Sequence, residues 1–225
     1  MSPRNPRSQK KPFKINTETD LDHKHSGTRQ ERTSYLILCE GKTERDYFVG
    51  MRTRHGPHIH VDIPGSDHVS IAREAAHRNS DEYSSIWCVL DTELDSVTTT
   101  KVLAIIQQSS ANACLSTPSF ETWLIMHHKD CLRPFQSADE AKRKLKAIIP
   151  SWSEGSTRFS DFSHGVQEAV RRARKIDPSG ESVLKNPSSN VWQLVDRLID
   201  TLEDGSSKHE TANPASRHKG SGVHR

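Results

Sequence analysis

The chain has 225 residues, a length that allows one medium domain, with or without an inserted lobe, around a substantial core. Only 32% of the residues are hydrophobic and the mean hydropathy is −0.76, so we expect a good part of the chain, mainly its two ends, to lie outside the fold. The formal net charge of +3 is compatible with a polyanionic partner without requiring one. No apolar run reaches membrane-spanning length and no signal-peptide core is present, which predicts a cytoplasmic protein without a membrane partner.

Composition divides the chain into four segments. Residues 1–32 are rich in Lys, Arg, Ser, Asn and Pro and predict a disordered basic arm, which could contact phosphates or act only as a solubilising leader. Residues 33–129 carry the pattern of an α/β core, residues 130–203 that of a helical lobe and a closing helix, and residues 204–225 that of a disordered tail. The four cysteines show no close pairing, which favours buried thiols over a zinc or disulfide site.

The first informative stretch is residues 36–48. An apolar strand is predicted to end at Cys39, Gly41 permits a tight turn, and Thr43 is a plausible N-cap of the following helix. Glu40 at the strand end and Glu44 in the first helical turn would then point at one place, as acid/base groups or cation ligands. The alternative is an ordinary capped helix with solvated acids. A phosphate-binding P-loop is excluded because the position five residues before Gly41, where that loop needs glycine, is occupied by Leu36.

A second strand is predicted at residues 58–63, followed by a helix that Ser66 or Asp67 caps. The next apolar strand, residues 86–90, places Asp91 at its carboxyl end, just as Glu40 follows the first strand. Asp91 and Glu93 are two residues apart, so both could reach one cation, with Asp95 in reserve. A solvated acidic loop is the alternative.

A helix at residues 98–108 and a short strand at residues 111–115 lead to a third polar site. There Ser119 and Glu121 stand at the start of an apolar helix, next to a strand end. That helix closes with His127 and His128, where imidazoles would complement the helix dipole.

The remaining helices are basic. One opens with a capping box at residues 137–140, and another centres on residues 166–173. Their cations suit a track along a nucleic-acid backbone, although a solvated helix face is the alternative. The cations are Lys142, Arg143, Lys144, Lys146, Arg171, Arg172, Arg174 and Lys175. The segment Asn186–Ser189 is predicted to open the last helix, whose apolar stripe runs from Val191 to Leu202.

Four blocks of residues together give the chain a family resemblance: it resembles the RloB-like proteins, which are built on a Toprim-type domain related to OLD-type nucleases. The blocks are Glu40-Gly41 with Thr43-Glu44 and Tyr47-Phe48, then Asp91-Thr92-Glu93, then Pro118-Ser119-Phe120-Glu121 up to His127, and finally Asn186–Ser189, within residues 34–202. The resemblance implies a Rossmann-like α/β fold and a site for Mg²⁺ or Mn²⁺ formed by Glu40, Glu44, Asp91, Glu93, Ser119 and Glu121.

Two residues depart from the family pattern. Glu93 stands where the second acid of the Toprim pair is usually aspartate. The region where OLD-type enzymes have a lysine offers Arg158, which we add to the predicted nucleic-acid contacts.

We therefore expect an α/β fold with a layered, mostly parallel sheet, a helical lobe and disordered termini. The expected function is metal-dependent cleavage of DNA or RNA, including tRNA, in anti-phage defence, with Glu40 and Glu44 as the catalytic residues and an ATPase as a possible partner. The alternative is a non-catalytic nucleic-acid-binding or regulatory subunit with a degenerate site. The residues leave the substrate, the trigger and the oligomeric state open.

Overall fold

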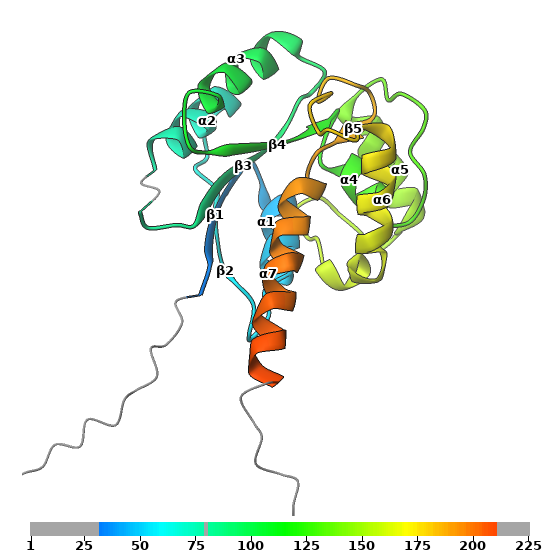
Figure 1. Cartoon of the computed structure of the whole chain (residues 1–225). Helices are drawn as coiled ribbons and strands as arrows, with labels where there is room; N and C mark the ends of the chain where they lie inside the picture. Colours follow the sequence, from blue (N-terminus) through cyan, green and yellow to red (C-terminus); the bar gives the residue numbers. More distant parts are fainter. Residues whose placement is uncertain (1–31, 79–80, 211–225) are drawn as a thin grey trace, which may run out of the picture. The chain divides into compact units, whose positions relative to one another are not determined.

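A five-stranded sheet forms the centre of residues 32–78 and 81–210, the part of the chain that the computed structural model describes (Figure 1). Its strands are β1 (Ser34–Cys39), β2 (His58–Asp62), β3 (Ser85–Asp91), β4 (Asn112–Thr117) and β5 (Ser188–Ser189). They lie in the order β2-β1-β3-β4-β5; the first four are parallel, and β5 runs antiparallel to β4. The expected mostly parallel α/β sheet is confirmed.

Helices cover both faces of the sheet because successive residues of a buried strand point to opposite sides. Leu36 and Leu38 of β1 pack on the face covered by α2 (His68–His77) and α3 (Ser96–Ile106). Tyr35 and Ile37 pack on the other face, with α1 (Lys42–Gly50) and α7 (Trp192–Glu210). Figure 1 shows α2 and α3 on one side of the sheet and α1 with α7 on the other.

The strand order reverses between β1 and β3. From β1 the chain passes through α1 to β2 at the edge, and then returns through α2 to β3 on the far side of β1. In open α/β sheets of this kind, ligands bind outside the carboxyl ends of the strands at such a reversal. The residues that follow β1 and end β3 are Glu40 and Asp91.

The helical segment that follows β4 shares a core with the sheet. It comprises α4 (Glu121–Met126), α5 (Ala138–Ile148), two short 3₁₀ turns (Phe159–Asp161 and Ser163–Gly165) and α6 (Val166–Ile176). Apolar side chains of α5 and α6 belong to the same buried cluster as Ile37 of β1 and Leu194 of α7. The predicted N-cap Ser137 is confirmed, since its side chain accepts the Glu140 N–H.

Local predictions were wrong at two element ends. Helix α1 is capped by Gly41 and not by Thr43, with the Glu44 carboxylate accepting the Gly41 N–H at 3.1 Å. The segment Ser188–Ser189 forms β5, so the last helix begins three residues later, at Trp192.

That helix continues to Glu210, past the predicted tail boundary at residue 204, while residues 1–31 and 211–225 of the predicted arm and tail lie outside the described residues. Between Arg32 and Glu210, leaving out residues 79 and 80, no helix is long and apolar enough to cross a membrane. All four cysteines are free and buried, as predicted.

Candidate active site

Two acids meet where the strand order reverses. Cys39, the last residue of β1, pairs with Val89 of β3, so Glu40 and Asp91 emerge from neighbouring strands at the same edge of the sheet. Glu44 lies one turn into α1, and the tight turn at Gly41 brings it back over the end of β1. Its side chain is buried, with 6% of the residue exposed. The predicted meeting of Glu40 and Glu44 is therefore part of a larger arrangement that includes Asp91.

The start of α4 supplies the fourth acid. The main-chain N–H of Phe120 donates to Asp91 Oδ1 at 2.8 Å, which ties this turn to the end of β3. Ser119 Oγ donates to Glu121 Oε2 at 2.6 Å, and both residues are buried. Ser119 thus orients Glu121, and the sequence-predicted pairing of a hydroxyl with a carboxylate at this helix start is present.

We call these four acids the carboxylate cluster: Glu40, Glu44, Asp91 and Glu121. In the last three, burial or like charge disfavours the ionised form. Burial and the charges of Glu44, Glu121 and Glu40 raise the pKa of Asp91 well above its ordinary value. Burial and the charges of Glu121 and Glu40 raise the pKa of Glu44 to about 7. Burial also raises the pKa of Glu121, against the opposing hydrogen bond from Ser119. These acids repel one another in a weakly solvated site.

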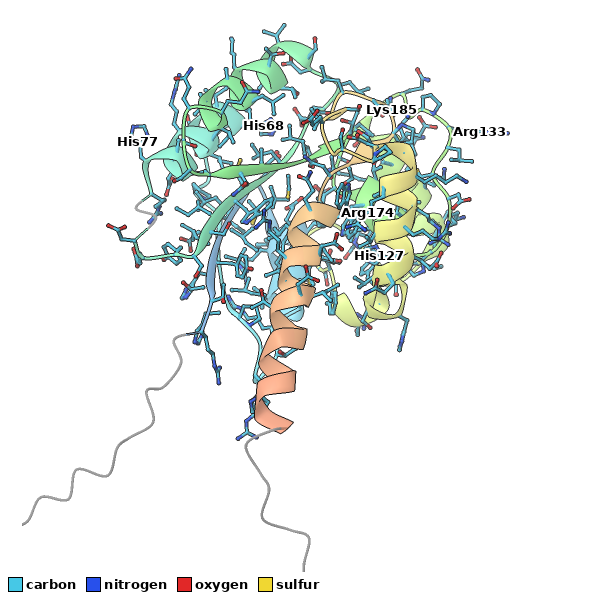
Figure 2. All side chains as sticks on the ribbon, in the orientation of Figure 1. His68, His77, His127, Arg133, Arg174 and Lys185 are labelled. Carbon is cyan, nitrogen blue, oxygen red and sulfur yellow. The ribbon has the colours of Figure 1, made fainter. Side chains whose placement is uncertain are left out.

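Glu40 behaves differently because a histidine donates a hydrogen bond to it. Its Oε2 lies 2.7 Å from Nε2 of His68, the first residue of α2 (Figure 2). Burial works to raise the pKa of Glu40, but the hydrogen bond and charge of His68 outweigh it, so that the pKa falls below its ordinary value. The same hydrogen bond raises the pKa of His68 against the effect of burial. Glu40 is therefore the member of the cluster held as a carboxylate.

A lysine also acts on the carboxylate cluster, although the sequence analysis predicted a different role for it. Lys142 of α5, predicted as part of a basic track, donates from Nζ to Glu154 Oε1 at 2.7 Å. Burial lowers the pKa of Lys142, but this hydrogen bond and the negative charges of Glu121, Glu154 and Asp91 raise it overall. Lys142 in turn helps to lower the pKa of Glu40.

The two predicted ligands that follow β3, Glu93 and Asp95, take part in local turn and cap contacts. Glu93 is exposed and has a left-handed backbone, with φ of 48°, in a turn that its N–H fixes by donating to Pro118 O. Its charge helps to raise the pKa of His68. Asp95, the reserve ligand, instead caps α3 by accepting the N–H groups of Val97 and Thr98.

The chemistry of the carboxylate cluster fits a hard divalent cation, since Mg²⁺ and Mn²⁺ prefer carboxylate oxygens and mutual repulsion leaves these acids short of positive charge. As the side chains lie, however, no three His, Cys, Asp or Glu residues in the described part of the chain are grouped closely enough to hold a metal ion. The metal therefore stays a prediction, to be tested below.

Much of the predicted basic track is paired with nearby acids. On α6, Arg171 pairs with Glu168, Arg172 with Asp130 and Arg174 with Asp196. Arg158 pairs with Asp161 in the first 3₁₀ turn. On α5, Lys144 lies over the Phe135 ring, and Arg143 donates to a carbonyl of its own helix. Figure 2 places Arg174 among the helices, close to α7 and apart from His68.

His127 has a structural role that differs from the predicted one. Burial lowers its pKa to about 3, so the ring is neutral and brings no charge to the end of α4. Because the Trp123 carbonyl, 3.0 Å from Nδ1, can only accept, Nδ1 carries the proton and Nε2 accepts the Tyr47 hydroxyl at 3.0 Å. The hydrogen bond between Tyr47 and His127 therefore joins α1 to the end of α4.

Comparison with known proteins gives one match. A family model described as RloB-like protein matches residues 35–198, a range that contains every member of the carboxylate cluster together with His68 and Lys142. A search of curated proteins and a search of solved structures found no match.

Proposed function

The chain belongs to the RloB-like protein family, and on this basis we propose that it is a metal-dependent nuclease that hydrolyses phosphodiester bonds of DNA or RNA. The observation that carries the proposal is the carboxylate cluster: four acids from three strand ends, three of them with raised pKa, at the reversal point of a parallel sheet. Perturbed acids gathered at such a place are typical of a catalytic site.

The unfavourable free energy of placing several ionised carboxylates together supports a cation as cofactor. Buried carboxylates stay ionised only with compensating positive charge, and His68 and Lys142 provide less charge than four acids require. We propose that Glu40, Glu44, Asp91 and Glu121 hold Mg²⁺ or Mn²⁺. Such an ion would activate water and offset the charge that develops on the phosphate.

The chain's own groups would supply the remaining chemistry. Glu40, kept ionised by His68, has its carboxylate available to accept a proton at neutral pH. Ser119 holds the Glu121 carboxylate in one orientation. Lys142 offers a cation beside the cluster, where it can bind a phosphate oxygen in place of Glu154.

Basic residues of the chain bear on the substrate, and the family resemblance bears on the partner. Arg143, Lys146 and the basic residues 1–32 would add phosphate contacts that do not depend on sequence. The family resemblance associates such proteins with restriction and anti-phage loci, and we extend to this chain a role in phage defence and cooperation with an ATPase partner.

Cleavage assays test the proposal directly. Purified protein should be incubated with plasmid, single-stranded DNA and tRNA, each with Mg²⁺, with Mn²⁺ and with EDTA. We expect cleavage with metal, none with EDTA, and none by Glu40→Gln, which keeps the side-chain size but removes the charge and the proton acceptor. Asp62→Asn is the matched control, because Asp62 is an exposed acid at the carboxyl end of the neighbouring strand.

Two outcomes would contradict the proposal. A fully active Glu40→Gln protein would remove the catalytic assignment. Wild-type protein that binds nucleic acid but cuts none of the substrates would favour the second candidate, a non-catalytic binding subunit. Glu93 is exposed, whereas the members of the carboxylate cluster are buried or half-buried, and this difference is the observation that favours the second candidate. Thermal melts of each variant would separate a folding defect from a chemical one.

A further inference from the structure

The contact between His68 and Glu40 joins two elements that are 28 residues apart in sequence. It is the one hydrogen bond between side chains that Glu40 makes within the described residues, beside a main-chain hydrogen bond from Asp91 to the same carboxylate. It is partly shielded, with 13% of the His68 side chain and 37% of the Glu40 side chain exposed. A carboxylate can only accept, so Nε2 of His68 carries the proton.

The capped and packed start of α2 fixes the position of His68. It follows Asp67, the N-cap of α2, whose carboxylate accepts both the Ser70 N–H at 3.1 Å and the Ser70 hydroxyl at 2.8 Å. Ile71 and Ala72 in the next turn are fully buried against the sheet. The cap and the packed helix fix the backbone from which the imidazole projects.

Apart from His68, the support that Glu40 has is a main-chain hydrogen bond from Asp91. Glu40 follows the last residue of β1, and Gly41 after it offers no side chain to pack against. The contact also differs from surface ion pairs such as Arg78 with Glu74 and Arg171 with Glu168, which join residues of the same helix or its cap. Without His68, the Glu40 side chain would keep only the main-chain hydrogen bond from Asp91, which restricts its rotamer less than the two contacts together.

We propose that His68 is the positioning residue for Glu40: by donating from Nε2 to Oε2, it holds the carboxylate in one rotamer and leaves Oε1 free to act in the reaction. This inference rests on the nuclease function proposed above. In metal sites, residues that hydrogen-bond to the metal ligands orient them in the same way. Removing such a residue costs about 10- to 100-fold in metal affinity or activity.

Kinetics of three variants test the role. In His68→Ala we expect kcat to fall about 10- to 100-fold while KM for nucleic acid changes little, because the lost group orients a reacting residue and does not bind substrate. His68→Gln, whose amide can still donate, should recover part of the rate. His77→Ala is the matched control at the other end of α2 and should keep wild-type kinetics. Full kcat in His68→Ala, or no recovery in His68→Gln, would overturn the proposal.

A second measurement is independent of cleavage. Thermal melts in EDTA of wild type, Glu40→Ala, His68→Ala and the double variant form a double-mutant cycle. We expect the two single changes to be non-additive, and additive changes would refute the contact. If wild-type protein cleaves nothing, the nuclease proposal fails, and the cycle still decides whether His68 holds Glu40. If wild type cleaves while His68→Ala keeps full kcat, only the positioning role fails.

Discussion

Replacing Glu44 with glutamine should stabilise the metal-free protein, although it alters a buried residue. The carboxylate of Glu44 is 6% exposed and is repelled by Glu121 and Glu40. Its structural contact, acceptance of the Gly41 N–H, can be kept by the glutamine oxygen. The substitution therefore removes a repelled charge while it leaves the capping interaction in place.

The size of the effect follows from the pKa. Burial and like charge raise the pKa of Glu44 from 4.5 to about 7, which corresponds to about 3 kcal/mol of unfavourable free energy when the group is ionised in the folded protein. Between these two values the folded protein binds more protons than the unfolded chain, so its stability falls as pH rises. Below pH 4.5 both states are protonated and the cost disappears.

Urea unfolding in EDTA at several pH values measures this difference. We expect Glu44→Gln to exceed wild type by about 3 kcal/mol at pH 8 and to lose that advantage as the pH falls to about 4. Glu140→Gln is the matched control: Glu140 holds the same third position in α5 and also accepts a main-chain N–H. Added Mg²⁺ should then stabilise wild type by RT ln(1 + [L]/Kd), or about 2.7 kcal/mol at 100 times its Kd, and should stabilise Glu44→Gln less because the Kd of the variant is higher.

The reasoning would be refuted by a Glu44→Gln protein that is destabilised equally at pH 8 and pH 4. That result would make Glu44 a capping residue and nothing more. Identical stabilisation of both proteins by Mg²⁺ and Mn²⁺ would remove Glu44 from the proposed metal site.

Two further predictions concern other parts of the chain. Deleting residues 1–32 should weaken nucleic-acid binding and lower the slope of log K against log salt. Each lost phosphate contact should lower the slope by about 0.9 for duplex DNA or about 0.7 for single strands. An unchanged slope in a salt titration would mean that this segment is only a solubilising leader. Tyr47→Phe should cost about 1–3 kcal/mol in urea unfolding, since it leaves the buried Nε2 of His127 without its donor, and a negligible loss would contradict the assigned tautomer.

The sequence alone determined the framework of the site. The apolar runs that end at Cys39 and Leu90 predicted two buried strands, and the acids that directly follow them, Glu40 and Asp91, had to emerge at the same edge if the strands were parallel neighbours. The position of Glu121 at a helix start was also readable, because caps and helix starts depend on residues close in sequence. Local patterns carry this information since each element forms from a contiguous stretch.

Only the tertiary structure decided which other groups join these acids. His68 and Lys142 reach the site from α2 and α5, and nothing in their own neighbourhoods distinguishes them from the other histidines and lysines of the chain. Glu93 was predicted as a ligand from its spacing to Asp91, and the structure adds that this residue is exposed and has a left-handed backbone. Such outcomes depend on how helices and turns pack across long sequence separations, and side-chain periodicity does not encode that geometry.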